Sequence, residues 1–244
     1  MVIICFFVVH WFSSLFFQTF FLHRYAAHRM FKMSKFWERT FYLLTFIFQG
    51  SSFLNARSYA IMHRMHHAYS DTDKDPHTPV TGGLVAMVLS MLKVYHGILV
   101  GNIVPEKRFT ENIAEWPLLE KVADSWLVRI GWGALYTLFY FYFATDWWMY
   151  LLLPMHYVMG PIHGTIVNYC GHKIGYRNFA RSRDNSRNTL FWDVLLLGEL
   201  FQNNHHTYPN RVNFAVRWFE FDPVYPLIRL MAFLGIVALA EQKK

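Results

Sequence analysis

Hydrophobic residues are gathered into long runs along this chain, and the polar stretches between the runs are rich in histidine. The first run extends from Met1 to Leu22, and two more, Trp126 to Ala144 and Trp147 to Ile166, are separated by only two residues. At about 1.5 Å per residue, an apolar helix of about 20 residues is long enough to cross the hydrocarbon core of a bilayer. The pattern therefore predicts three membrane-spanning helices, over 1–22, 126–144 and 147–166.

Two further apolar stretches are predicted to lie at the membrane rather than across it. The run from Thr40 to Leu54 is short for a span, and polar residues interrupt it. We interpret residues 36–59 as an in-plane or re-entrant helix packed under the first span. The C-terminal run, 223–240, carries Arg229 in its middle. Because an arginine at the bilayer centre costs about 2.5–3.5 kcal/mol, this run favours an interfacial helix.

The composition supports an all-α integral membrane protein with a single domain over residues 1–244. Hydrophobic residues make up 54% of the chain and charged residues 16%, whereas about a quarter of a soluble domain is charged. The net charge of +7 comes from Arg and Lys beside the apolar runs, as the positive-inside rule describes. Arg24 should therefore lie outside the bilayer core. No basic stripe stands apart from the apolar runs, so the sequence does not indicate nucleic-acid binding.

Eight of the thirteen histidines fall in four short segments, HRYAAH, HRMHH, NYCGHK and QNNHH. They are His23, His28, His63, His66, His67, His172, His205 and His206. In HRMHH the i, i+3, i+4 spacing puts all three on one helical face. In HRYAAH the i, i+5 spacing separates the two by about 140° on a regular helix. Both then reach one site only if the helix ends or bends between them, or if each binds a different metal.

The number of histidines predicts two metal ions in a cap at one side of the membrane. Imidazole suits iron, copper, nickel and zinc, and eight imidazoles exceed the usual coordination number of one ion. Two redox metals beside a hydrophobic interior suit the activation of dioxygen against an unactivated C–H bond. A hydrocarbon substrate would reach such a site through an apolar tunnel between helices.

The boxes HRYAAH, HRMHH and QNNHH, with the intervening DPH and NYCGH, resemble those of the membrane fatty acid desaturases. The most similar branch is the acyl-CoA Δ9 (stearoyl-type) desaturases, in a short bacterial-like form. The resemblance implies that the eight histidines hold two irons and that Asn168 is linked to a metal through water. It also implies insertion of a cis double bond into a saturated acyl thioester or acyl lipid, with dioxygen and two electrons. The electrons would come from a separate carrier, ferredoxin-like or a haem protein with its reductase. The site is expected to face the cytoplasm, at a bacterial cytoplasmic membrane.

The chain departs from the family pattern at three places. Gln202 stands where the third box has its first histidine; its carbonyl oxygen can ligate a metal or hold a water. Met62 stands where an acidic residue usually precedes the second box. Only one clear span precedes HRYAAH, where the family commonly has a hairpin.

Several polar residues near the boxes have two possible roles each. Glu199 either orients a histidine ligand or caps the next helix. Asp75 and His77 in DPH belong either to the site or to a hydrogen-bonded turn. A basic segment either receives an anionic head group or acidic electron donor, or forms a solvated loop. Its candidate residues are Arg177, Arg183, Asn185 and Arg187.

Two alternative functions remain open from the sequence. The first is a related di-iron hydroxylase or acetylenase, because a small shift of the acyl chain relative to the metals changes the product. The second is a haem or metal-binding membrane protein without enzymatic activity. A haem site needs axial histidines on facing helices inside the bilayer, whereas these histidines lie in boxes at one end.

Overall fold

The computed structural model describes residues 1–239, and most of them are helical. The longer helices are α1 (Val2–Phe17), which continues as the π-helix η1 (Gln18–Ala27), α2 (Lys35–Gln49), α3 (Ala56–Tyr69), α4 (Gly83–Leu99), α7 (Trp126–Phe143), α9 (Met159–Lys173) and α11 (Val224–Phe233). The shorter ones are η2 (Gly50–Ser52), α5 (Lys107–Thr110), α6 (Pro117–Ala123), η3 (Trp147–Leu152), α8 (Leu153–Tyr157) and α10 (Gln202–Thr207). The strands β1 (Phe31–Met33) and β2 (Val237–Leu239) pair antiparallel, with Phe31 opposite Leu239. The prediction of a mainly helical chain is confirmed, and this ribbon is the exception to the all-α expectation.

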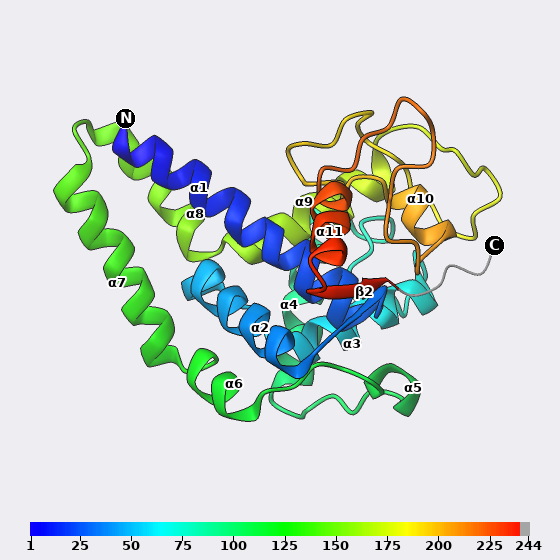
Figure 1. Ribbon diagram of the computed structural model, residues 1–244, viewed down its shortest axis with the longest axis horizontal. Coiled ribbons are helices and arrows are strands. Elements are labelled where there is room, and N and C mark those ends of the chain that lie inside the picture. Colours follow the sequence, from blue (N-terminus) through cyan, green and yellow to red (C-terminus); the bar gives the residue numbers. More distant parts are fainter. Residues whose placement is uncertain (240–244) are drawn as a thin grey trace.

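The first helix connects the two ends of the molecule. It runs from the end where α7 and α8 lie toward α3 and α10 at the other end (Figure 1). Among residues 1–239, the helix formed by α1 and η1 together, Val2–Ala27, is the one that is long and apolar enough to cross a membrane. It extends five residues beyond the predicted 1–22. Aromatic rings bind α2 to it: Phe17 stacks on Phe48 with ring centroids 5.0 Å apart, and Phe20 lies 4.7 Å from Phe41.

A single helix over 36–59 is wrong, although α2 does pack against the first helix as expected. The chain turns after Gln49, where Gly50 adopts φ +52°, a left-handed conformation that side chains disfavour. The side chain of Gln49 accepts a hydrogen bond from the backbone N–H of Leu54. Asn55 then caps α3 by accepting from Ser58 N–H. The stretch is therefore two helices joined by a tight turn.

Substituting Gly50 with alanine is expected to destabilise this turn. An added Cβ would lie 1.8 Å from the hydroxyl oxygen of Tyr136, and the positive φ adds a cost of about 1–2 kcal/mol. The melting temperature of the purified protein should fall. The double variant Gly50→Ala/Tyr136→Phe should recover the part of the loss in melting temperature that the clash with the hydroxyl causes. Wild-type melting of the single variant would contradict the turn as described.

The continuous helix predicted over 147–166 is also wrong, because the chain there forms η3, α8 and α9 in succession. The break lies at Val158, which has non-helical φ and ψ angles of −132° and 27°. Pro161 has no N–H to donate to the carbonyl of Tyr157, four residues earlier. The hydroxyl of Ser51, in the η2 turn, donates to that carbonyl instead, at 3.2 Å. Thus the turn that ends α2 also supplies a hydrogen bond to the carbonyl that the break between α8 and α9 leaves without a backbone donor.

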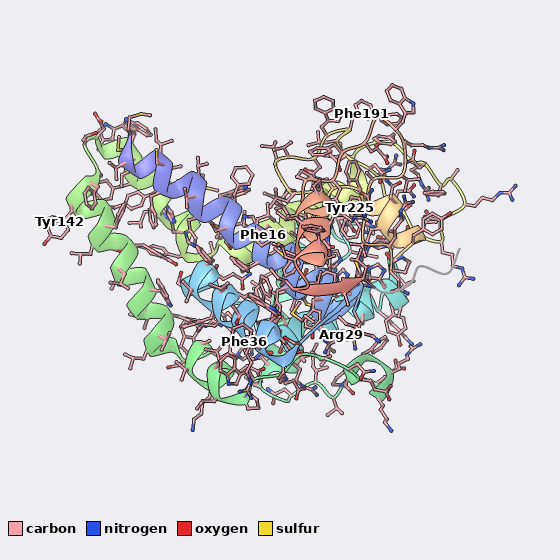
Figure 2. All side chains as sticks on the ribbon, viewed as in Figure 1. Phe16, Arg29, Phe36, Tyr142, Phe191 and Tyr225 are labelled. Carbon is pink, nitrogen blue, oxygen red and sulfur yellow. The ribbon has the colours of Figure 1, made fainter. Side chains whose placement is uncertain are left out.

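The other predicted elements differ in their ends or agree. The helix at 126–144 is confirmed as α7; its outer side chains are largely apolar, and Tyr142 points away from the molecule (Figure 2). That 126–144 and 147–166 cross a membrane stays a prediction. The helix over 223–240 is too long: α11 ends at Phe233, Gly235 turns with φ +71°, and the chain returns as β2. Residue 240 lies outside the described residues.

Candidate metal centre

Eight histidine side chains converge from η1, α3, α9 and α10 into two sets. The larger set, hereafter the five-histidine set, is His23, His28, His63, His67 and His205; the three-histidine set is His66, His172 and His206. Within each set, one ring nitrogen per residue lies within 4.8 Å of all the others. The structure thus brings together every histidine that the sequence analysis selected.

The π-helix explains how both histidines of HRYAAH reach one set. At the C-terminal end of η1 the backbone N–H of His28 donates to the carbonyl of His23, five residues earlier, at 3.2 Å. This winding needs about one residue more per turn than an α-helix. Residues spaced i, i+5 therefore lie one above the other instead of about 140° apart. The π-helix continues through Ala27 to its C-cap His28, and both histidines lie in one set, so the change in winding is an arrangement that the spacing did not predict.

The Nε2 atoms of the five-histidine set point at one another. The Nε2 atom of His205 lies 3.0 Å from that of His23 and 2.9 Å from that of His67, and those of His28 and His63 are 2.7 Å apart. Nitrogens bound to one metal at about 2.1 Å and at right angles are about 3.0 Å apart. Burial lowers the pKa of His63 and His67 well below the usual range, so these rings are neutral. Mutual hydrogen bonds cannot satisfy so many converging nitrogens, whereas a cation among them can.

Four of the eight histidines contact a carboxylate through Nδ1, the ring nitrogen other than Nε2. The pairs are Glu199 with His23 at 2.6 Å, Asp75 with His66 at 2.9 Å, Asp71 with His172 at 3.0 Å and Asp184 with His206 at 2.5 Å, each measured to Nδ1. Such a carboxylate keeps the proton on Nδ1, so Nε2 offers its lone pair to a metal. This arrangement is typical of histidines that bind metals.

Two of the four carboxylates were missed by sequence reasoning. Burial alone would raise the pKa of Asp71 and Asp184, but hydrogen bonds from His172 and His206, respectively, hold both pKa values below the usual range. Glu199 and Asp75 were considered, but Asp71 and Asp184 lie in loops whose path the sequence does not reveal. The acidic content of the loop after HRMHH is the one local signal.

Replacing Glu199 with glutamine is expected to lower metal affinity by about 10–100-fold. Glutamine keeps the size of the side chain but cannot hold the Nδ1 proton of His23 with a charge. Competition with a chelator on the purified protein measures the change. Glu115→Gln is the matched control, because Glu115 pairs with Arg57 at the surface. Equal retention by both variants would contradict the orienting role of Glu199.

Gln202 and Asn168 line the same cavity as His23 and His63 of the five-histidine set. The amide nitrogen of Gln202 donates to the backbone carbonyl of Glu199 at 2.7 Å. Its carbon chain packs on Gly171, where a Cβ would lie 2.3 Å away from it. The amide nitrogen of Asn168 donates to the carbonyl of Gly164 at 2.8 Å. The nitrogen of each amide is therefore occupied, and the oxygen is the atom left for a metal or a water.

Comparison with known proteins identifies the family. Residues 1–234 match the family model named fatty acid desaturase. The chain belongs to the fatty acid desaturase family. It is 30% identical to the sn-1 stearoyl-lipid 9-desaturase of Anabaena variabilis, over 91% of this chain and 78% of that protein. It is 29% identical to the Delta-9 desaturase-like 5 protein of Arabidopsis thaliana, over 89% and 70%. A hex-5-enoyl-[acyl-carrier protein] acetylenase of Moorena producens (strain JHB) is 28% identical, over 88% and 70%.

The family and these relatives confirm the predicted enzyme class. The desaturase is an oxidoreductase that introduces unsaturation into fatty acyl chains. The histidine sets agree with the di-metal site that the family uses. The acetylenase among the relatives keeps the related-reaction alternative open.

A cavity of about 910 Å³ leads to the metal centre of the desaturase. Exposed Lys121 and Trp126 lie along its outer part, and buried His23, His63 and Gln202 lie along its inner part. Small-molecule sites commonly have volumes of about 300–1,000 Å³ and mainly apolar walls. The walls here include many apolar side chains, such as Leu15, Met62, Met91, Leu99 and Val167. The cavity suits a flexible hydrocarbon chain passing beside the five-histidine set.

Two arginines of the basic segment donate hydrogen bonds to backbone carbonyls within that segment. Arg177 donates to the carbonyl of Asp184 at 2.8 Å, and Arg187 donates to the carbonyl of Gly175 at 3.1 Å. The backbone N–H of Asn185 donates to the carboxylate of Asp71 at 2.6 Å. Arg183 is exposed. These contacts hold the loop that carries Asp184 against His206.

Proposed function

We propose that this desaturase inserts a cis double bond into a saturated fatty acyl chain at a di-iron centre held by the eight histidines. The observation that carries the proposal is the pair of adjacent imidazole sets beside an apolar cavity. An acyl lipid is the proposed substrate class, because the Anabaena relative is a stearoyl-lipid desaturase. A fatty acyl thioester is the alternative carrier.

The donor set suits iron. Imidazole nitrogen is a good ligand for iron, and the converging Nε2 atoms have the spacing expected around an ion. When bound, the two irons would supply the reduction of one dioxygen to two waters. Two electrons from the carrier with two protons, together with two hydrogens removed from the acyl chain, would complete this reduction and leave an alkene in the chain.

The protein's own residues contribute orientation and exclusion of water. Glu199, Asp71, Asp75 and Asp184 hold the Nδ1 protons of their partner histidines and so orient the rings. The apolar cavity wall aligns the alkyl chain next to His63 and keeps bulk water away. Asn168 and Gln202 are proposed to hold a water beside the metals by their carbonyl oxygens.

A separate carrier is proposed to deliver the electrons, either ferredoxin-like or a haem protein with its reductase. Exposed Arg183 precedes Asp184, whose carboxylate contacts His206. An acidic carrier or an anionic head group bound at this loop would therefore lie close to the three-histidine set. We place this face on the cytoplasmic side of a bacterial membrane, with the apolar helices in the bilayer.

Expression in a host that lacks its own desaturase tests the proposed function. Gas chromatography with mass spectrometry should detect a new monounsaturated chain, and chemical derivatisation should locate its double bond. A hydroxylated chain without an alkene would instead favour a hydroxylase. A triple bond formed from a supplied monounsaturated chain would favour the acetylenase reaction.

A further inference from the structure

The two histidine sets differ in size, and the smaller one has too few nitrogens to complete the coordination sphere of an ion. The five-histidine set can nearly fill the coordination sphere of an ion, whereas His66, His172 and His206 offer three nitrogens. A four-coordinate ion already needs one more donor. The Nε2 atom of His172 is buried and has no hydrogen-bond partner among residues 1–239. An additional ligand for this set should therefore lie nearby.

His77 is a buried imidazole beside His66 of the three-histidine set. Its ring centroid lies 4.2 Å from that of His66. It is 2% exposed, and neither of its nitrogens has a hydrogen-bond partner within the described part of the chain. Its side chain forms a second potential metal-binding group with His66 and Asp75, in which the donor atoms lie within 4.8 Å of one another. Buried polar groups without partners are rare in proteins and need an explanation.

The backbone next to His77 is fixed to the same site. Its N–H donates to the Asp75 carboxylate at 3.0 Å, and that carboxylate also contacts Nδ1 of His66. Asp71, from the same loop, accepts from Nδ1 of His172 and from the hydroxyl of Thr78. The loop is thus tied to two ligands of the set, while no hydrogen bond within residues 1–239 holds the imidazole of His77 itself. The ring therefore has no such hydrogen bond to break when it approaches an ion next to His66.

We propose that His77 is the fourth imidazole ligand of the ion held by His66, His172 and His206. The proposal rests on the di-metal function proposed above. Gln202 is the competing candidate, but an amide oxygen is a weaker ligand for such a metal than imidazole. With His77, the two sets would hold nine imidazoles.

Iron retention by the purified full-length protein tests this assignment. After loading with Fe²⁺, wild-type protein should hold about two irons per chain and release them slowly to a ferrous chelator. His77→Ala should hold about one, or release one iron at least 10-fold faster. His77→Gln, which keeps the volume of the side chain, should show the same loss and so separate it from misfolding. His96→Ala, at an exposed histidine, should retain both irons.

Variants at Gln202 decide between the two candidates. Gln202→Leu should retain both irons if His77 is the ligand. The double variant His77→Ala/Gln202→His should regain the second iron, because a histidine there would restore the fourth imidazole. Retention of both irons by His77→Ala, or loss of one by Gln202→Leu, would overturn the assignment while leaving the di-iron function intact. Wild-type protein that takes up no iron would overturn both.

Discussion

Replacing His205 with alanine is expected to abolish desaturation and to empty the five-histidine set. The Nε2 atom of His205 lies within 3.0 Å of those of both His23 and His67, so its removal takes a ligand from the middle of the set. The product should fall below detection when the variant is expressed in a host without its own desaturase. The purified variant should hold at most one iron per chain.

The design of this experiment separates metal loss from loss of the fold. His205 is buried against Phe214, with ring centroids 4.7 Å apart, so His205→Gln is the companion variant that preserves packing. Both variants should lose activity, and His205→Gln should be produced at the wild-type level. Substantial alkene formation by either variant would show that the five-histidine set is not the reaction centre.

Replacing Arg24 with methionine is expected to lower the free energy of unfolding by about 3–5 kcal/mol, because it leaves the carboxylate of Asp222 buried and unpaired. Both side chains are fully buried, 3.0 Å apart. Arg24 also donates to the carbonyl of Val212 and lies over the ring of Phe214, 4.0 Å from its centroid. Thermal unfolding of the purified protein, at fixed detergent concentration, measures the change.

An exposed ion pair provides the matched control. Arg57 and Glu115 contact each other at 2.9 Å at the surface, where such pairs contribute about 0–1 kcal/mol. Arg57→Met should therefore leave the melting temperature nearly unchanged. If Arg24→Met melts like Arg57→Met, the buried pair does not hold residues 212–222 against the first helix.

More of the metal centre than of the surrounding fold could be predicted from the sequence. The eight histidines are identified by local spacing, although both histidines of HRYAAH reach one set only through the π-helical winding of η1. The carboxylates Asp71 and Asp184 could not be found in this way, because their contacts depend on how two irregular loops fold. Arg24 was expected outside the bilayer core, but hydropathy could not show that Asp222, almost 200 residues later, would pair with it.

The ends of the helices were the least predictable features. Hydropathy recognises an apolar run but not its interruptions, so it joined α2 to α3 and merged η3, α8 and α9. The two breaks are joined by a hydrogen bond between distant segments, from Ser51 to the carbonyl of Tyr157, which hydropathy does not detect. The strand β2 exists because β1 lies beside it, and a three-residue pattern cannot reveal its partner.

The π-helix at the first box has a consequence for how box spacing should be interpreted. In η1, a five-residue separation places His23 and His28 in the positions that a four-residue separation would occupy on an α-helix. Deleting one residue between them, such as Ala26, would let the segment rewind as an α-helix with both rings still directed at the metal. Box spacing and helix winding are thus interchangeable, and sequences with boxes of different length can present the same pair of ligands.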